Sequence, residues 1–455
     1  MQKIDGKHIY FTGIGGIGMS GIAEILLDYG YRVSGSDIKT SNVTDRLQKK
    51  GAVIYIGQKA ENISEEIDII VRSSAIRENN PELMRAKELG IAMLHRSEML
   101  AHLMEDKRAI CVAGAHGKTT TSSMIALMME LAGLDPAVVV GGEIYQIGSN
   151  AKSGKSDILV AEADESDGSF LNLLPWMAVI TNVEEDHLDH YKNLDAIRDA
   201  FQEFVHKTGE NGVAVLNYDC EETRQLASLV PGKLISYGFA EDAQVQSRNW
   251  RYEGGLNKAE VYLDGNLLGT LELQVPGKHN ISNGLAAVAA GLEIGMKFED
   301  IKAGLAQFGG ARRRFQLLGH VHDIQIIDDY AHHPTEIAAT IQAARGVHQG
   351  RLVAVFQPHR YSRTKFLADK FAESFQLADE VILTDVYSAG EDLSEGAEST
   401  AIIDHMDQSV QMVHREKLNG FLLEFVQPGD MVLMMGAGNI WQNSMQLVED
   451  LKHKE

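Results

Sequence analysis

The residues with the clearest chemical pattern are GAHGKTTT at 114–121, a glycine loop of the kind that binds nucleotide phosphates. Backbone N–H groups of such a loop cradle phosphate, its lysine reaches the terminal phosphates, and a threonine hydroxyl can bind Mg²⁺. The loop is a shortened variant, because Val112 stands where the full motif has its first glycine. A strand expected at 109–113 and a helix expected at 122–131 flank it, which favours a phosphate site over a loop without a ligand. The predicted ATP contacts are Gly114, Ala115, His116, Gly117, Lys118, Thr119 and Thr120, with Lys118 as a catalytic cation.

A second glycine loop, GIGGIG at 13–18, follows a strand expected at 8–13 and opens a helix expected at 20–29. Its glycines let the backbone approach a diphosphate, and the helix N-terminus favours the negative charge. Asp37 ends the next expected strand, at 31–36, as in dinucleotide-binding domains. The pattern predicts a diphosphate nucleotide but does not distinguish NAD from a UDP-sugar, and a tight turn without a ligand is the plain alternative.

Carboxylates that follow another expected strand are candidates for holding a divalent ion. Glu162 ends the apolar stretch 158–161, and carboxylates at the carboxyl end of a parallel strand face the ligand side of an open α/β sheet. Together with Thr119 it predicts a Mg²⁺ site, in which Mn²⁺ can substitute. Glu165 and Asp167 are expected to be the solvated start of a helix.

His187 lies in EEDHLDH at 184–190, after a strand expected at 177–182. The stretch can be an acidic first turn of a helix, which the helix dipole favours. It can equally make His187 a ligand of a second divalent ion, although magnesium prefers oxygen ligands. The spacing leaves both interpretations open, and His187 is the third metal candidate.

Two clusters of arginine stand out in this acidic chain. Residues 312–314 are RRR, and residues 359–363 are HRYSR, directly after a strand expected at 352–357. Guanidinium groups match carboxylate and phosphate oxygens, so both clusters are candidate anion sites, although solvated surface arginines are the common alternative. The stretch DDYAHHP at 328–334 likewise ends an expected strand, at 324–328.

Strands, among them those expected at 158–162 and 431–435, alternate with helices along the chain, which predicts parallel sheets with right-handed crossovers. A charged patch at 105–108 and the arginines at 312–314 divide this alternation into three units. We therefore expect an α/β protein with three domains: a Rossmann-like domain at 1–106, a central P-loop ATPase domain at 107–313 and a Rossmann-like domain at 314–455. The central domain should combine a mostly parallel sheet with a small β insertion at 250–275, in which Asp264-Gly265-Asn266 is a turn.

Length and composition fit this organisation. At about 150 residues per domain, a chain of this length suggests three domains. The formal net charge of −22 argues against binding to nucleic acid or to an anionic membrane. The two cysteines, Cys111 and Cys220, do not support a disulfide framework. The N-terminus lacks the pattern of a secretory signal and no apolar run is long enough to span a bilayer, so we expect a cytoplasmic protein.

Taken together, the motifs resemble those of the Mur ligases, and the resemblance covers essentially the whole chain. Three motifs, GIGGIGMSGIA, DDYAHHPTE and QPHRYSRT, resemble those of the members that add L-alanine. The other stretches that carry the resemblance, all in the family's order, are GAHGKTTT, EADESDGSF, NVEEDHLDHY, PGKHNISNGLAA, ARRRFQ, DVYSAGE and GAGNIW.

This resemblance implies an ATP-dependent enzyme that joins L-alanine to the lactyl carboxylate of UDP-N-acetylmuramate in peptidoglycan precursor synthesis. ATP would phosphorylate the carboxylate to an acyl phosphate, and the alanine amine would then displace phosphate. The implied partners are ATP, UDP-N-acetylmuramate and L-alanine, without nucleic acid or membrane, and the implied assembly is a monomer or a homodimer.

The resemblance also implies roles for residues by position. The expected UDP-sugar contacts are Gly13, Gly15, Gly16, Gly18, Asp37, Ser73 and Ser74. The residues expected near adenine are His279, Asn280 and Asn283. The residues expected around L-alanine are Tyr330, His332, His359, Arg360 and Arg363, and the catalytic candidates are Lys118, His332, Arg360 and Arg363. His332 is the candidate base, because the amine must be neutral to attack. The metal site would combine Thr119, Glu162 and His187.

The chain departs from the family's pattern at one position. Other Mur ligases carry a carbamylated lysine on the helix after the Asp-His motif, whereas residues 195–206 contain no lysine. We therefore expect no carbamate here, with Glu203 as the candidate replacement.

Three other functions compete with the ligase. A NAD-dependent dehydrogenase would leave the loop at 114–121 unused, and a non-catalytic ATP-driven switch would leave the first glycine loop unused. A related ligase that recycles murein tripeptide onto the same sugar should differ in the first glycine loop and in the third domain.

Overall fold

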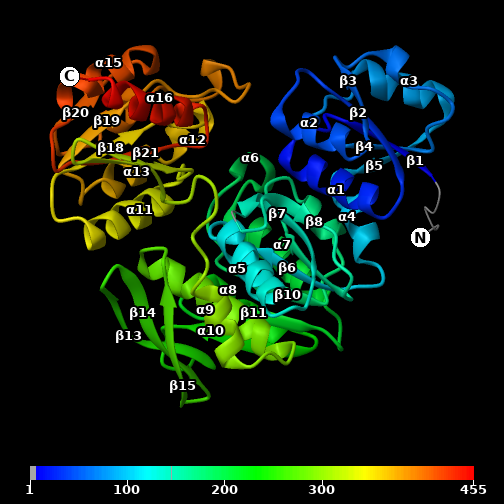
Figure 1. The fold of residues 1–455 in the computed structure, drawn as a ribbon, viewed down its shortest axis with the longest axis horizontal. Coiled ribbons are helices and arrows are strands. Elements are labelled where there is room, and N and C mark those ends of the chain that lie inside the picture. The colour runs from blue at the N-terminus through cyan, green and yellow to red at the C-terminus, as the bar shows by residue number, and fades with distance from the viewer. Residues whose placement is uncertain (1–6, 145, 455) are drawn as a thin grey trace. The chain divides into compact units, whose positions relative to one another are not determined.

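The computed structural model describes residues 7–144 and 146–454, and the strands in this part of the chain form three sheets (Figure 1). Each sheet is the centre of one α/β domain, so the expected three-domain fold class is confirmed. The first two domains together form one compact unit, and the C-terminal domain forms the other, with the β insertion divided between the two units.

The N-terminal sheet has the strand order β3-β2-β1-β4-β5, and all neighbouring strands are parallel. Along β1, Ile9 and Phe11 pack on one face with residues of α1, whereas Tyr10 packs on the opposite face with Leu83 of α3. This alternation buries both faces of the sheet under helices, as a parallel sheet requires. The elements are β1 (His8–Thr12), α1 (Ile17–Asp28), β2 (Arg32–Asp37), α2 (Asn42–Lys49), β3 (Val53–Ile56), β4 (Ile69–Arg72), α3 (Pro81–Leu89), β5 (Ala92–His95) and α4 (Arg96–Met104).

The central sheet has the strand order β15-β14-β13-β12-β11-β10-β6-β9-β7-β8. Strand β6 lies between β9 and β10 and is parallel to both, whereas β8 runs antiparallel to β7 at the edge. The phosphate loop therefore starts from the middle of the parallel core. The strands are β6 (Arg108–Ala113), β7 (Ala137–Ile144), β8 (Ser149–Lys152), β9 (Ile158–Glu162), β10 (Met177–Ile180), β11 (Val213–Asn217), β12 (Lys233–Gly238), β13 (Val245–Glu253), β14 (Leu256–Leu263) and β15 (Asn266–Leu273). The helices are α5 (Lys118–Leu131), α6 (Leu188–Tyr191), α7 (Leu194–His206), α8 (Glu221–Gln225), α9 (Lys278–Glu293) and α10 (Phe298–Leu305).

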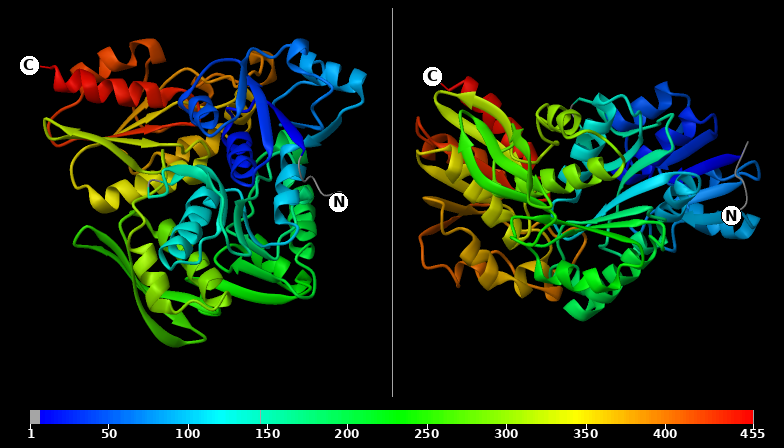
Figure 2. Two further views of the ribbon diagram at one scale, coloured as in Figure 1. Left: turned by 45° about the vertical axis from the view of Figure 1, so that its right-hand side comes forward. Right: turned by 90° about the horizontal axis from the view of Figure 1, so that it is seen from below.

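The expected β insertion is present as β13, β14 and β15, which follow one another at one end of the central sheet (Figure 2). The first turn is made by Gly254 and Gly255, with φ +62° and +78°, and the second by Asp264 and Gly265, with φ +48° and +79°. Positive φ at both central residues is the conformation that joins tightly twisted antiparallel strands. The predicted turn at 264–266 is therefore confirmed.

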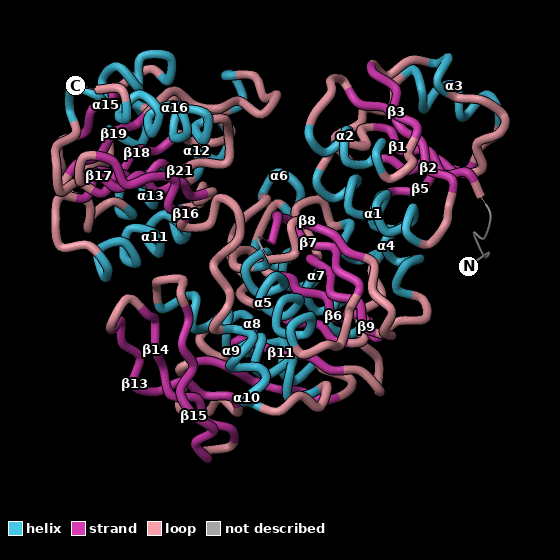
Figure 3. The backbone as a smooth tube through the Cα atoms, in the orientation of Figure 1, coloured by secondary structure: helices cyan, strands magenta, loops and turns pink. Residues whose placement is uncertain are grey.

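The C-terminal sheet has the strand order β16-β17-β21-β18-β19-β20, with β16 antiparallel and the other neighbours parallel. Its helices lie on both sides of the strands (Figure 3). The strands are β16 (Gln316–Val321), β17 (Ile324–Asp329), β18 (Leu352–Phe356), β19 (Glu380–Leu383), β20 (Val410–Met412) and β21 (Met431–Met435). The helices are α11 (Pro334–Val347), α12 (Tyr361–Phe366), α13 (Ala368–Ser374), α14 (Thr400–Ile403), α15 (Leu418–Phe425) and α16 (Ile440–Lys452).

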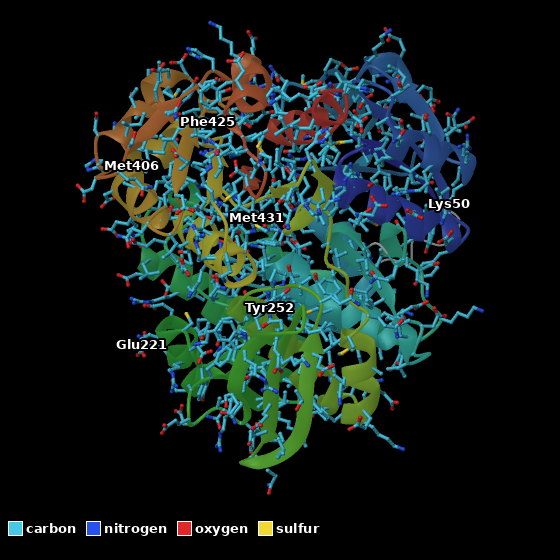
Figure 4. The ribbon with its side chains drawn as sticks, turned by 60° about the vertical axis from the view of Figure 1, so that its left-hand side comes forward. Lys50, Glu221, Tyr252, Met406, Phe425 and Met431 are labelled. Carbon is cyan, nitrogen blue, oxygen red and sulfur yellow. The ribbon has the colours of Figure 1, made fainter. Side chains whose placement is uncertain are left out.

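Two apolar clusters hold the C-terminal sheet between its helices. Along β21, Met431 packs in the cluster of α11 and α13, whereas Val432 packs in the cluster of α15 and α16. Phe425, labelled with Met431 in Figure 4, is the last residue of α15. The centre of its ring lies 5.0 Å from the guanidinium carbon of Arg351. Within residues 7–144 and 146–454, a membrane-spanning helix is absent.

The sequence placed the buried strands well and the helix starts less well. The strands expected at 158–162 and 431–435 are observed with those bounds as β9 and β21. Helix α5 begins at Lys118, earlier than the expected start at 122, because Gly117 ends the loop in a left-handed conformation. The expectation of a solvated helix start at Glu165 and Asp167 is wrong: Glu165 is buried, and the first helical turn after β9 is a 3₁₀ turn at Ser169–Asn172.

Candidate active site

The phosphate loop lies between β6 and α5, where the backbone turns through conformations that glycine adopts most easily. Gly114 has φ +134° and Gly117 has φ +83°. A Cβ atom at Gly114 would collide with the Thr181 hydroxyl, and one at Gly117 would lie 2.7 Å from Oδ1 of Asn283. Thr181, which follows β10, also donates from Oγ1 to the carbonyl oxygen of His116 at 2.6 Å. The loop is thus held from β10, and Asn283, expected near adenine, lies beside it.

The Lys118 ammonium group is enclosed by the loop and by an acidic side chain. Its Nζ donates to the carbonyl oxygens of Gly114 and Ala115, at 2.7 and 3.2 Å, and to Oε1 of Glu165 at 2.8 Å. Burial opposes the charge, but the surrounding carboxylates, Glu165 foremost, outweigh burial and raise the pKa of Lys118 to about 12. Lys118 is therefore a cation at any physiological pH, as binding of terminal phosphates requires.

Thr119 and Glu162, two of the predicted metal ligands, lie together. Thr119 and its neighbour Thr120 are buried in the first turn of α5. Glu162 ends β9, accepts a hydrogen bond at Oε2 from the Gly141 N–H at 2.8 Å, and is also hydrogen-bonded by the Thr119 side chain. Burial raises the pKa of Glu162, while Lys118 and these hydrogen bonds oppose that shift. A nearby cation would favour the ionised carboxylate further.

Glu165 belongs to this site, which the sequence reasoning missed. Its side chain is 4% exposed, Oε1 contacts Lys118, and within the described part of the chain its buried Oε2 has no hydrogen-bond partner. A buried carboxylate oxygen without a partner is costly unless a cation or a ligand satisfies it. The donors therefore fit a divalent ion, because Glu162, Glu165 and Thr119 supply the oxygen ligands that Mg²⁺ prefers. The available signal was the glutamate three residues after Glu162.

The position of His187 agrees in part with each of its two interpretations, as the start of a helix and as a metal ligand. It stands directly before α6 with φ +54°, and its N–H donates to Oδ1 of Asp186 at 2.7 Å, so the stretch does begin a helix. Its Nε2 lies 3.6 Å from Oε1 of Glu165, so the ring also faces the metal candidates. Glu203 does not share this placement: it is 58% exposed on α7 and lies 3.8 Å from Lys207, one turn along the helix. These contacts give no support to Glu203 as a replacement for a carbamylated lysine.

The segment after β9 also contacts the N-terminal domain of the same compact unit. Oδ2 of Asp164 lies 2.9 Å from Nη2 of Arg96, at the start of α4. Asp167 accepts a hydrogen bond from the Ser74 hydroxyl, which lies 2.9 Å from Nε2 of His95. Glu162 and Glu165 of this segment thus face the phosphate loop, whereas Asp164 and Asp167, which alternate with them, contact the first domain.

The first glycine loop joins β1 to α1, and Gly16 is the N-cap of that helix. The N–H of Gly15 donates to Oδ2 of Asp37 at 2.8 Å, so Asp37 shapes the loop from the end of β2. A Cβ atom at Gly18 would lie 3.1 Å from Nη1 of Arg96. The guanidinium of Arg96 therefore lies between this loop and the acidic segment.

Ser73 and Ser74 lie beside the same loop, after β4. The carbonyl of Ser73 accepts a hydrogen bond from the Ile76 N–H at 3.1 Å. Cδ1 of Ile76 lies 3.4 Å from the position that a Cβ atom at Gly13 would occupy. The predicted UDP-sugar residues thus gather at the carboxyl ends of β1, β2 and β4, where open α/β sheets bind ligands.

In the C-terminal domain, the aromatic residues predicted to bind the amino-acid substrate lie in a row. The ring centres of Tyr330 and His332 are 5.3 Å apart, and those of His332 and His359 are 6.0 Å apart. Tyr387 stacks on His359 at 5.5 Å, with 14° between the planes. The guanidinium carbon of Arg313 lies 5.0 Å from the Tyr330 ring centre. These loops follow β17, β18 and β19.

The two histidines of this line differ in their surroundings. His332 Nδ1 lies 3.1 Å from the Tyr330 carbonyl and 3.1 Å from Oε2 of Glu336. Burial lowers the pKa of His359 to about 3, with the nearby cations acting in the same direction. His359 is therefore neutral, whereas His332 is held by its contacts with Tyr330 and Glu336.

The other predicted residues of this compact unit lie in two places. Arg360 and Arg363 are at the start of α12, and Nε of Arg360 donates to Oε1 of Glu391 at 2.5 Å. Burial foremost, with Arg314 in the same direction, lowers the pKa of His279 to about 4, and Nδ2 of Asn280 donates to the Pro276 carbonyl at 2.7 Å. Asn280 thus fixes the chain that enters α9.

Comparison with known proteins agrees with this geometry. The model of the Mur ligase family, catalytic domain, matches residues 8–108, the Mur ligase middle domain matches 112–291, and the Mur ligase, glutamate ligase domain, matches 313–438. This chain belongs to the Mur ligase family.

Within that family the chain is similar to ligases whose names specify L-alanine. It is 47% identical to the UDP-N-acetylmuramate–L-alanine ligase of Pelotomaculum thermopropionicum, over 99% of this chain and 98% of that protein. It is 48% identical to the ligase of the same name from Geotalea uraniireducens, over 98% of each. The crystal structure of UDP-N-acetylmuramate-alanine ligase from Thermotoga maritima superposes with a TM-score of 0.83 at 30% identity, covering 98% of this chain and 100% of that one. A murein peptide ligase from Psychrobacter arcticus, with a TM-score of 0.75 at 24% identity over 99% of this chain and 100% of that one, shares the fold.

Replacing Lys118 tests the phosphate loop. Lys118→Ala should lower ATP turnover by about 10²–10³-fold or more, because it removes the cation aimed at the terminal phosphates. Phosphate release measures the loss, and calorimetry should show that binding of the sugar nucleotide persists. Lys107→Ala, at the opposite end of β6, is the matched control, since Nζ of Lys107 donates to the carbonyl oxygen of Ser156, away from the phosphate loop. Near-normal turnover of Lys118→Ala would exclude this loop as the phosphate site.

Proposed function

We propose that this chain joins L-alanine to the lactyl carboxylate of UDP-N-acetylmuramate, with conversion of ATP to ADP and phosphate. The observation that carries the proposal is the Lys118 cation in a phosphate loop beside Glu162 and the buried Glu165. The full-length likeness to ligases named for L-alanine supports the choice of substrates. The reaction belongs to peptidoglycan precursor synthesis, and we place it in the cytoplasm, with a monomer or homodimer as the assembly.

The chemistry needs activation because a free carboxylate is a poor electrophile. A lactyl carboxylate oxygen attacks the γ-phosphorus of ATP, ADP leaves, and an acyl phosphate remains. The alanine nitrogen then attacks the acyl carbon, phosphate leaves, and the surplus amine proton passes to a base. Lys118 stabilises the charge on the transferred phosphoryl group, and the loop holds that group in place.

Thr119, Glu162 and His187 would hold the magnesium ion, and the unpartnered Oε2 of Glu165 adds a fourth donor. When bound, Mg²⁺ neutralises charge on the phosphate oxygens. The chain's own part is to hold these donors together at the start of α5. The positive charge of Lys118 and the negative charges of the neighbouring carboxylates balance one another there.

In the C-terminal domain, His332 is the proposed base for the alanine amine. Its contact with Glu336 holds the ring in place. Neutral His359, Tyr330 and the arginines of α12 would surround the amino acid. A methyl side chain contributes only about 1–3 kcal/mol in a pocket, so larger residues must be excluded by shape and glycine only in part.

The first domain, which we delimit as 1–106, would hold the UDP-sugar at the glycine loop. The central domain, 107–313, would bind ATP through the phosphate loop, with His279, Asn280 and Asn283 near adenine. The C-terminal domain, 314–455, would bind the amino acid. A NAD-dependent enzyme would leave Lys118 and its carboxylates without a purpose.

A substrate panel tests this function. We expect ATP- and UDP-N-acetylmuramate-dependent phosphate release with L-alanine, weak release with glycine or L-serine, and none with murein tripeptide. Mass spectrometry of the product should show the alanyl adduct. Calorimetry with NAD is the control for the first glycine loop. Tight NAD binding without UDP-sugar binding, or turnover with the tripeptide alone, would contradict the proposal.

The metal ligands are tested by titration. Glu162→Gln and His187→Ala should each raise the magnesium concentration needed for half-maximal activity, because each removes a ligand. Glu203→Gln, on the exposed face of α7, is the matched control and should leave the titration unchanged. If both site variants titrate like the unmodified protein, these residues do not bind the ion.

The third domain is tested at Arg363. Arg363→Ala should raise the KM for L-alanine by about 10–100-fold, the loss expected for one hydrogen bond between charged groups. The KM values for ATP and UDP-sugar should stay within about twofold, because a single contact to the third substrate is removed. Lys365→Ala, exposed on the same helix, is the matched control. Loss of UDP-sugar affinity with an unchanged alanine KM would place Arg363 in the sugar-nucleotide site.

A further inference from the structure

Glu391 is a buried carboxylate in the loop after β19, and no role described so far requires it. Its side chain is 7% exposed. Oε1 accepts hydrogen bonds from Nε of Arg360 at 2.5 Å and from Oγ of Ser362 at 2.7 Å, and Oε2 accepts from the Ser362 N–H at 3.0 Å. Both oxygens are thus directed at the first turn of α12.

The backbone on both sides is bent to make this contact. Ala389 and Gly390 have φ +51° and +91°, which turn the loop back towards α12. Arg360 itself has φ +70° and ψ 131°, a conformation that residues with a side chain rarely adopt. Such a conformation persists only where its surroundings enforce it, and it is frequent at functional sites.

Two backbone hydrogen bonds join the loops that carry these residues. The Arg360 N–H donates to the Tyr387 carbonyl at 2.9 Å, and the Tyr387 N–H donates to the Pro358 carbonyl at 2.8 Å. Tyr387 in turn stacks on His359, in the predicted amino-acid site. The loop after β19 is therefore attached to the loop after β18 at several points.

The Arg360–Glu391 pair is more than a surface ion pair. Both side chains are largely removed from water, at 27% and 7% exposure, so removal of one partner would leave the charge of the other poorly solvated. Burial opposes ionisation of Glu391, but the hydrogen bonds from Ser362 and Arg360 outweigh it and lower the pKa of Glu391. The carboxylate is therefore ionised, and Nε of Arg360 is committed to it.

We propose that Glu391 is a positioning residue of the amino-acid site: it fixes Arg360 and the first turn of α12, so that Arg363 is presented to the carboxylate of the incoming amino acid. Arg360 is the N-cap residue of α12, its carbonyl accepts the Thr364 N–H at 3.1 Å, and Arg363 lies in the first turn, so the conformation of Arg360 sets the start of the helix that carries Arg363. The charge of Arg360 is compensated by Glu391, so Arg360 acts through orientation and Arg363 makes the direct contact. This inference rests on the proposed function of the C-terminal domain.

The division of labour predicts how the substitutions combine. Glu391→Ala should raise the KM for L-alanine by about 3- to 10-fold, the range expected when one long side chain must be ordered on binding. The kcat and the KM values for ATP and UDP-sugar should stay within about twofold, because the interaction removed concerns binding of the amino acid. Adding Arg360→Ala to Glu391→Ala should cost little more, because both variants remove the same pair. Adding Arg363→Ala to Glu391→Ala should raise the KM for L-alanine hardly beyond the value for Arg363→Ala alone, because Glu391 acts through Arg363.

Three further variants keep the test decisive. Glu391→Gln retains an acceptor for Arg360 but loses the charge, so its KM should fall between those of the unmodified protein and Glu391→Ala. Asp392→Ala is the matched control: the neighbouring side chain caps a 3₁₀ turn at Ser394 and should not change the alanine KM. Ser362→Ala removes one donor to Glu391 and should have a smaller effect than Glu391→Ala. Thermal melts identify any variant that is unfolded, and Glu391→Gln then carries the comparison.

The outcomes separate this inference from the proposed function. If Arg363→Ala raises the alanine KM while Glu391→Ala and Glu391→Gln leave it unchanged, the positioning role is overturned and the amino-acid site stands. If the effects of Glu391→Ala and Arg360→Ala on the KM for L-alanine multiply in the double variant, the two residues do not act as a pair and the inference is overturned as well. If Arg363→Ala weakens UDP-sugar binding alone, the proposed role of the C-terminal domain fails first.

Discussion

The site depends on one ammonium group among carboxylates. Glu162, Asp164 and Glu165 lie close enough together to repel one another, and the nucleotide phosphates would add further negative charge. Lys118 makes this concentration of charge tolerable, and the carboxylates in turn keep Lys118 protonated in a buried position. Each side of this balance is stable only in the presence of the other. The glycine loop and the strands β6 and β9 can therefore be seen as the scaffold that holds opposite charges within hydrogen-bonding distance.

The C-terminal domain solves a similar problem with different groups. There the buried carboxylate is Glu391, and its counter-ion is a guanidinium with a directional Nε. A guanidinium fixes geometry better than an ammonium does, because its donors lie in a rigid plane. An ammonium group can follow phosphate oxygens that move during the reaction, because its donors are not confined to one plane. A planar guanidinium instead binds a small carboxylate in one fixed orientation.

Sequence patterns were sufficient where periodicity and local motifs decide the structure. The buried strands β9 and β21, the turn at Asp264 and the position of Lys118 follow from apolar runs and glycine spacing. Glu165 was misjudged because its burial results from a lysine 47 positions away, which no local pattern reveals. The pairing of Arg360 with Glu391, 31 positions apart, escaped for the same reason. Charged residues are exposed by default, so only tertiary contacts identify those that are not.

The order of contacts along the segment after β9 constrains how this chain can change in evolution. Glu162 and Glu165 face the phosphate loop, while Asp164 and Asp167 face the first domain, so neighbouring positions serve different partners. An amide at one of these positions would keep the spacing. An insertion or deletion of a single residue would exchange the partners and leave Lys118 opposite a side chain meant for Arg96 or Ser74. Selection on this stretch should therefore act on its length more strictly than on the identity of any one acid.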